Sequence, residues 1–249
     1  MARNFDGTDD QLTVAVAVAT AAPLSLAGWC NADNLTVSEV LVNISKDTDD
    51  NDDFYILLAG AVAGDFVHFN ARDAGVGGAA ITTTAFSAGV WQHVLGVELS
   101  SSSRAVYLNG GGKGTNTTLV EPTGLNRTSI GVRNRLSDTF FFDGLLAECC
   151  VFNDDLSDAE AVMLANGLHP FALRLGSLVG YWPIYGHASP EVDWSGNGNN
   201  MTVTGTTVAD HIYTTPPLRQ AAGWRGAFVA AAANPAYQPW YHRAPVLAQ

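Results

Sequence analysis

The segment from Asp193 to Asn199 carries side chains that could bind a metal ion. Asp193, Asn197 and Asn199 offer carboxylate and amide oxygens, which hard cations such as Ca²⁺ prefer, and the glycines between them let backbone carbonyls converge. Glu148 lies on a strand that is predicted to be adjacent to this segment, and its carboxylate could supply a further oxygen ligand to the ion. These residues therefore predict a calcium site. The alternative is a turn in which the same side chains hydrogen-bond to their own backbone and hold no ion.

The same segment also contains an aromatic residue suited to sugar binding. Carbohydrate recognition needs an exposed aromatic ring with hydrogen-bonding groups nearby. Trp194 lies among the Asp and Asn side chains, and Tyr185 and His187 precede it closely. We therefore predict a carbohydrate site formed by Trp194, Tyr185 and His187, with the alternative that Trp194 caps the core.

Catalysis is not expected. Glycoside hydrolysis with retention needs two carboxyl groups about 5–5.5 Å apart, and the only E-x-D sequence is Glu191-Val192-Asp193, with no further acid before Asp210. The chain has no G-x-S-x-G sequence. Cys149 and Cys150 lie in a very apolar stretch, where cysteine is usually an inert hydrophobic residue. We therefore predict no catalytic residues and a protein that is not an enzyme.

A second acidic segment runs from Asp47 to Asp53. Its spacing resembles the start of an EF-hand loop, but glycine is missing at the sixth position and Leu58 occupies the twelfth. A solvated hairpin tip, with carboxylates that repel one another, is the better interpretation.

Composition excludes several classes of protein. The 249 residues carry a net charge of −12, which disfavours binding to the phosphate backbone of nucleic acids. No apolar run approaches the roughly 20 residues that span a bilayer, so no membrane association is expected. The first ten residues, MARNFDGTDD, do not resemble a signal peptide, which predicts synthesis in the cytoplasm of the producing cell without a signal peptide.

Alternating apolar and polar residues predict many short strands. Residues 12–18 and 91–99 alternate clearly, whereas residues 145–152 are apolar on both faces and indicate a central strand covered on both sides. Ser157 and Glu160 form a capping box that predicts one short helix, ending near Gly167 and placed at an edge or end of the sandwich. The pattern is typical of an all-β sandwich of two antiparallel sheets.

The last part of the chain differs from the rest. After Asp210 there is no acidic residue. Residues 1–215 are predicted to form the sandwich domain and residues 216–249 an extended C-terminal arm, which either wraps its own domain or docks on a neighbour. Aromatic and Arg side chains concentrate binding energy at interfaces. The predicted partner-binding residues of the arm are Arg219, Trp224, Arg225, Phe228, Tyr237, Trp240, Tyr241 and Arg243.

Several short motifs together resemble the concanavalin A-like lectin/glucanase superfamily, specifically its laminin-G and pentraxin-like jelly rolls. They are FDGTDD at residues 5–10, WQHV at 91–94, VYLNG at 106–110, FDGLLAE at 142–148, YWP at 181–183 and DWSGNGN at 193–199. The resemblance implies a jelly-roll fold and Ca²⁺ as the cofactor, near the last of these motifs. The position of that motif after the helix resembles jelly-roll domains of tailed-bacteriophage structural proteins.

The resulting functional hypothesis is a non-enzymatic virion structural protein, either a capsid decoration or cement protein or a tail-associated subunit. Its partners would be other virion proteins, bound through the sandwich surface and the arm, and its location the virion. A homo-oligomer within a symmetric assembly is expected. The alternative is a lectin-like, carbohydrate-binding module that recognises bacterial surface glycans.

Overall fold

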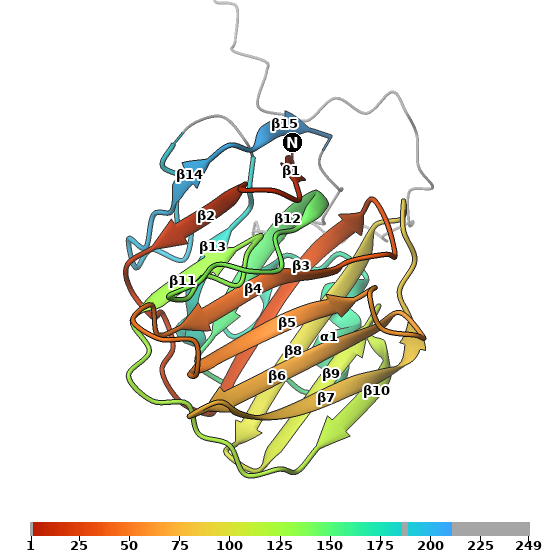
Figure 1. Ribbon diagram of the computed structural model, residues 1–249, viewed down its shortest axis with the longest axis vertical. Coiled ribbons are helices and arrows are strands. Elements are labelled where there is room, and N and C mark those ends of the chain that lie inside the picture. Colours follow the sequence, from red (N-terminus) through yellow and green to blue (C-terminus); the bar gives the residue numbers. More distant parts are fainter. Residues whose placement is uncertain (1, 186–188, 211–249) are drawn as a thin grey trace, which may run out of the picture. The chain divides into compact units, whose positions relative to one another are not determined.

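The computed structural model describes residues 2–185 and 189–210, and the structural statements below refer to these residues. Their strands form two antiparallel sheets packed face to face, and Figure 1 shows β4 to β7 of one sheet crossing over β3, β8 and β9 of the other. The predicted all-β jelly-roll sandwich is therefore confirmed. The predicted boundary between residues 215 and 216 lies outside the described residues.

The larger sheet has eight strands and the smaller sheet has seven. The larger sheet runs in the order β10 (Gly111–Asn116), β9 (Ser103–Leu108), β8 (Gln92–Ser100), β3 (Leu24–Ala32), β12 (Asp143–Phe152), β1 (Ala2–Asp6) and β15 (Thr207–Ala209), with β13 (Leu178–Trp182) also paired to β12. The smaller sheet runs in the order β14 (Thr202–Thr204), β2 (Gln11–Val14), β11 (Arg127–Ile130), β4 (Ser38–Ser45), β5 (Asp53–Ala59), β6 (Phe66–Asp73) and β7 (Val76–Ala85).

The main core lies between the two sheets. In β6, Val67, Phe69 and Ala71 are buried, while the residues between them are half-buried on the outer face. This alternation follows from the strand geometry, which points successive side chains to opposite faces of the sheet. The predicted period-2 pattern therefore identified the core-facing side of this strand.

Strand β12 is covered on both faces, as predicted. Cys149 packs in the core between the sheets, whereas Cys150 packs in a second apolar cluster on the outer face of the larger sheet. Between Ala147 and Cys150 the register against β3 shifts by one residue, and Glu148 takes a positive φ of 54°. The extra residue is a β-bulge, at which the partner of β12 on one side changes from β1 to β13.

The predicted helix is α1 (Asp158–Ala165), and its capping box is present. Its Ala161 and Leu164 belong to the second apolar cluster, together with residues of β8, β9 and β12. The helix thus covers the outer face of the larger sheet, and the predicted position at an edge or end was wrong. Two short 3₁₀ helices follow, η1 (Pro170–Ala172) and η2 (Leu175–Ser177). No helix in the described part of the chain is both long and apolar enough to cross a membrane.

The two sheets meet along strands β7 and β10. A Cβ atom added to Gly114 of β10 would lie 1.7 Å from the carbonyl oxygen of Ile81 in β7. Only glycine permits this approach of the two backbones. The glycine-rich sequence after Asn109 therefore closes one side of the sandwich.

The acidic segment from Asp47 to Asp53 is not a solvated tip with unpaired charges. Asp53 is fully buried and binds Arg133, with its two oxygens 2.6 and 2.9 Å from Nε and Nη2. The Arg133 guanidinium also lies 4.1 Å from the ring centre of Tyr55. Asp47 and Asp49 pair with Arg127 and Lys46, respectively. The expected mutual repulsion was wrong because the carboxylates are paired, with Arg127 and Arg133 from a distant segment and with Lys46 directly before the acidic segment.

Candidate functional site

The loop after β13 is organised by the carboxylate of Asp193. Its Oδ1 accepts hydrogen bonds from the backbone N–H groups of Tyr181 and Ser195, at 3.0 and 2.8 Å. Its Oδ2 accepts from the N–H of Asn199 at 2.9 Å. A buried carboxylate that accepts several N–H groups fixes the backbone around it. Asp193 therefore ties both ends of the loop to β13.

Trp194 projects from this loop and is 44% exposed. Its backbone N–H donates to the carbonyl oxygen of Tyr181 at 2.7 Å. Its ring meets the ring of Tyr185 edge to face, at 5.2 Å between centres and 85° between planes, and that of Tyr181 at 6.4 Å and 89°. Such T-shaped pairs are a preferred aromatic geometry. The indole is thus held by two tyrosine rings and remains accessible from solvent.

Polar groups of the same loop lie close in sequence to the exposed indole. Asn197 donates through Nδ2 to the carbonyl oxygen of Val179 at 3.3 Å and to Oγ of Ser195 at 3.0 Å. Its Oδ1 accepts no hydrogen bond from the described residues, and Asn197 is exposed. Asn200 accepts from the backbone N–H of Asp193. An aromatic ring with amide groups nearby is the composition expected of a sugar site.

The predicted calcium ligands are only partly brought together. Asp193, Asn197 and Asn199 share one loop, but the first binds backbone amides, and Nδ2 of Asn199 donates to the carbonyl oxygen of Val179 at 3.1 Å. The carboxylate of Glu148 accepts a hydrogen bond from the hydroxyl of Tyr181. The contacts correspond to the alternative of a turn stabilised by its own side chains. Calcium at these residues stays a prediction.

Glu148 belongs to a buried polar chain beneath the aromatic residues. Nδ1 of His169 accepts from the backbone N–H of Phe171 at 3.3 Å. This contact places the ring proton on Nε2, which lies 2.9 Å from the hydroxyl of Tyr181. Burial, reinforced by the charge of Glu148, raises the pKa of Tyr181. The tyrosine therefore stays protonated, and its hydroxyl donates a hydrogen bond to the carboxylate. This network was not foreseen, because the residues come from three separate segments.

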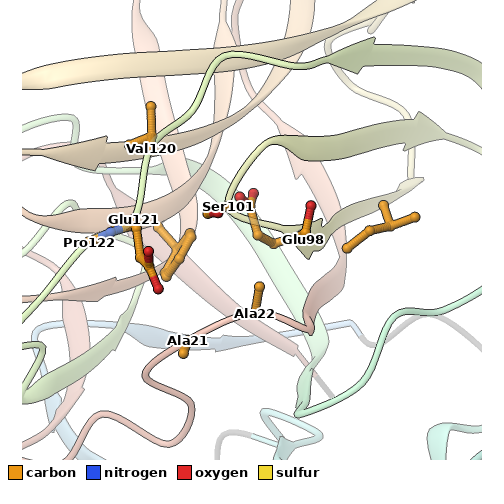
Figure 2. Close-up of a pocket in the computed structure, with 10 residues that line it drawn as sticks. Ala21, Ala22, Glu98, Ser101, Val120, Glu121 and Pro122 are labelled. Carbon is orange, nitrogen blue, oxygen red and sulfur yellow. The ribbon is translucent and has the colours of Figure 1, made fainter.

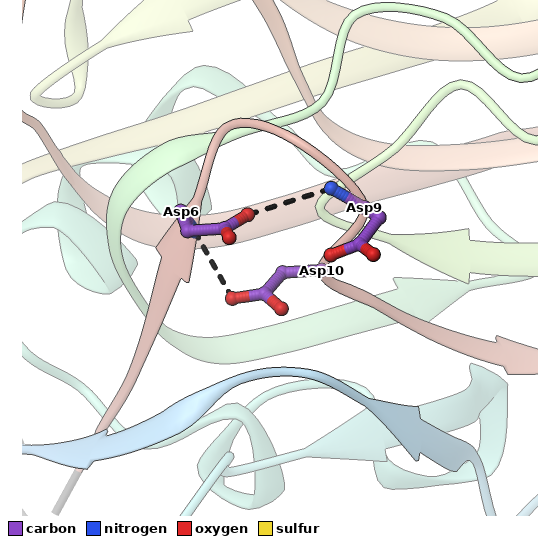
Figure 3. Close-up of side chains that lie close together, drawn as sticks. All are labelled: Asp6, Asp9 and Asp10. Carbon is purple, nitrogen blue, oxygen red and sulfur yellow. Dashed lines mark hydrogen bonds between the residues drawn. The ribbon is translucent and has the colours of Figure 1, made fainter.

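A turn that sequence reasoning noted only as a motif brings three carboxylates together. Oxygens of Asp6, Asp9 and Asp10 lie within 4.8 Å of one another (Figure 3). Asp6 already accepts from the backbone N–H groups of Thr8 and Asp9, and Asp10 accepts from that of Asp6. Burial, followed by the charge of Asp6, raises the pKa of Asp10. Their remaining oxygens are of the type that binds hard cations.

The acids considered for hydrolysis lie on separate networks. Glu191 forms an ion pair of 3.1 Å with Arg3 and accepts from the backbone N–H of Tyr185. Asp193 holds the loop as described above. Each carboxylate therefore has a structural partner.

His93 lies in another part of the fold, on β8. His93 is packed against Trp29, with ring centres 5.3 Å apart, and burial lowers its pKa to about 3. It is therefore a neutral, packed residue. His187 and all predicted arm residues in 216–249 lie outside the described residues.

The fold and the exposed loop define a lectin-like sandwich. The sequence profile of the concanavalin A-like lectin/glucanase superfamily matches residues 6–162. The chain belongs to this superfamily, as its motifs predicted. A comparison with curated protein sequences finds no match.

Solved structures with low sequence identity share the fold. The heptameric SAP-like pentraxin of Limulus polyphemus has a TM-score of 0.61 and 13% identity, over 84% of this chain and 94% of the pentraxin. The CBM40 module of the Ruminococcus gnavus IT-sialidase, bound to α2,3-sialyllactose, has a TM-score of 0.53 and 14% identity, over 66% and 98% of the two chains. Domain 4 of the arabinanase AbnA from Geobacillus stearothermophilus, in complex with arabinotriose, has a TM-score of 0.54 and 19% identity, over 66% and 76%.

Proposed function

We propose that the chain is a carbohydrate-binding module and that the sugar binds at Trp194 and Tyr185. The observation that carries this proposal is the exposed Trp194 indole, held edge to face by Tyr185 on a loop fixed by Asp193. Exposed tryptophan held in one orientation loses little conformational freedom on binding, which favours affinity. This was the alternative hypothesis from the sequence, and the shared fold of sugar-bound modules supports it better than the virion hypothesis.

The chemistry of the loop matches that of a sugar. The C–H groups on one face of a sugar ring pack on an aromatic face, while its hydroxyl groups need donors and acceptors. Trp194 supplies the apolar face, and the free Oδ1 of Asn197 is an acceptor for a hydroxyl. The site offers no cationic side chain among these residues, which fits a neutral sugar better than an anionic one.

A glycan array tests this function. The wild-type chain should bind a defined group of oligosaccharides, and Trp194→Ala should reduce binding by tenfold or more. Phe140→Ala is the matched control, because Phe140 is a similarly exposed aromatic residue, at 40%, in a different part of the fold. The absence of any binding by the wild-type chain, or equal loss in both variants, would disprove the proposal.

The virion hypothesis remains a prediction of the sequence. Its proposed contact residues lie in 216–249, outside the described residues, and none of the similar structures named above is a phage protein. Deleting residues 217–249 and measuring incorporation into particles would test it separately. A glycan-binding module could also be part of a virion, so the two hypotheses do not exclude each other.

A further inference from the structure

A cavity of about 250 Å³ opens at one end of the sandwich, between the two sheets. Figure 2 shows Ala21 and Ala22 on one side, facing Glu98 and Ser101 on the other. Its volume is near the lower end of small-molecule pockets, roughly 300–1,000 Å³, and far above the ~30 Å³ of one water molecule. The complete lining is Ala21, Ala22, Phe54, Glu98, Leu99, Ser100, Ser101, Val120, Glu121 and Pro122.

The walls of this cavity are held by one buried arginine. Arg104 binds both oxygens of Glu98 at 2.9 Å. Its Nη2 also donates to the carbonyl oxygen of Ser101 at 3.2 Å, and its Nη1 to Oδ1 of Asn116 at 2.7 Å and the carbonyl oxygen of Thr118 at 2.9 Å. These five contacts use every N–H donor of the guanidinium. Arg104 therefore fixes the turn after β8 and the loop before Val120, so the cavity exists before any ligand arrives.

The lining combines apolar side chains with two serines and two glutamates. Glu98 is fully buried and its charge is balanced by Arg104. Glu121 is exposed and makes no ion pair within the described residues. Among the residues that the structure describes, no basic side chain lines the cavity. The apolar side chains, which include Phe54 and Val120, form the rest of the wall.

The surroundings of Glu121 strengthen its negative potential. Asp52 accepts from the backbone N–H of Thr123, close to Glu121 in sequence, at 3.4 Å. Desolvation, followed by a side-chain hydrogen bond with Asp52 and the charges of Asp52 and Glu121, raises the pKa of Asp73. The neighbouring Lys46 pairs with Asp49 at 2.6 Å. Clustered charge of one sign attracts the opposite charge.

We propose that this cavity binds a small organic cation, namely a primary ammonium group attached to a compact hydrocarbon body. The ammonium pairs with Glu121 at the rim, and the hydrocarbon body packs against Ala21, Ala22 and Phe54. The site shares no residue with the loop of Trp194, so this proposal goes beyond glycan binding and does not depend on it.

Cyclohexylamine and cyclohexanol are matched probes, because they share one ring and differ in charge. At pH 7 the amine is protonated. Titrations followed by ¹H–¹⁵N NMR should shift the amides of residues 98–101 and 120–121, with the amine binding roughly three- to fivefold more tightly than the alcohol. Equal affinities, no shifts, or shifts confined to other residues would overturn the proposal.

Two variants locate the contact. Glu121→Gln should remove the preference for the amine while preserving the weak binding of the alcohol. Asp65→Asn removes a carboxylate outside the cavity lining and should preserve the preference. Ala21→Phe, at an exposed position, should fill the cavity and weaken both probes more than tenfold. If Glu121→Gln retains the preference, the proposal is wrong even if Ala21→Phe fails to fold.

Discussion

Two buried carboxyl groups of this protein differ in protonation state. Glu98 is matched by Arg104, whereas Glu39 is buried with no cationic partner among the described residues. Burial, with the nearby charges of Asp143 and Asp33, raises the pKa of Glu39 from 4.5 to about 8. Glu39 is therefore a neutral acid in the folded protein at pH 7, and Glu98 is a paired anion.

The free energy of unfolding should consequently fall as the pH rises between about 4.5 and 8. In this window the folded protein keeps a proton on Glu39 that the unfolded chain releases, which favours the unfolded state by up to about 1.4 kcal/mol per pH unit. Glu39→Gln should remove this slope and stabilise the protein at pH 8 by at least ~1 kcal/mol. Urea denaturation of both proteins at pH 5 and pH 8 measures the change in the free energy of unfolding with pH. The same pH dependence in the wild type and in Glu39→Gln would contradict a neutral Glu39.

Replacing Arg104 should have a large effect because it leaves Glu98 buried without a partner. Arg104→Met is expected to lower the free energy of unfolding by about 3–5 kcal/mol. The matched control is Lys113→Met, which breaks the exposed pair with Asp158 and should cost less than ~1 kcal/mol. Chemical denaturation of both variants checks this. Similar decreases in the free energy of unfolding for the two variants would show that the buried ion pair stabilises the protein no more than the exposed one.

At the scale of the elements, the close approach of β10 and β7 makes Gly114 hard to replace. A methyl group there would collide with the backbone of Ile81, so the two strands must move apart. Gly114→Ala should lower the free energy of unfolding by roughly 1–3 kcal/mol. At Gly176, where an added Cβ meets nothing within 4 Å, the same change should stay within ~0.5 kcal/mol. Equal effects at both positions would contradict the steric explanation.

The strands could largely be predicted from sequence, whereas their partners could not. Alternation identified the core face of β6, and the apolar stretch around Cys149 and Cys150 identified the doubly covered β12. In β8 the alternating residues Leu95 and Val97 lie in the outer cluster, and the pattern did not show that this strand is buried on both faces. The capping box gave the start of α1, but the face that the helix covers depends on packing across the larger sheet. Local sequence encodes the type of element, and long-range packing decides where the element lies.

The same limit applies to the candidate site. The sequence placed Asp193, Asn197, Asn199 and Trp194 in one loop because they are adjacent in the chain. It could not show that the Asp193 carboxylate is occupied by backbone amides. Nor could it show that Glu148 sits at a β-bulge with positive φ and binds Tyr181. These features depend on contacts between residues distant in sequence.

For the whole molecule, the two proposed sites differ in character. The loop of Trp194 presents an aromatic ring and amides to solvent, whereas the cavity at the end of the sandwich is concave and acidic. The net charge of −12 should favour cations over anions at both, and this preference should weaken with added salt.

The most direct test of carbohydrate binding at Trp194 is an NMR titration of the ¹⁵N-labelled chain with the oligosaccharide that ranks first on the array. The account predicts that the Trp194 indole N–H and the backbone amides of residues 193–199 shift together and saturate with a single affinity. Shifts confined to other surfaces, with the Trp194 signal unchanged, would contradict it.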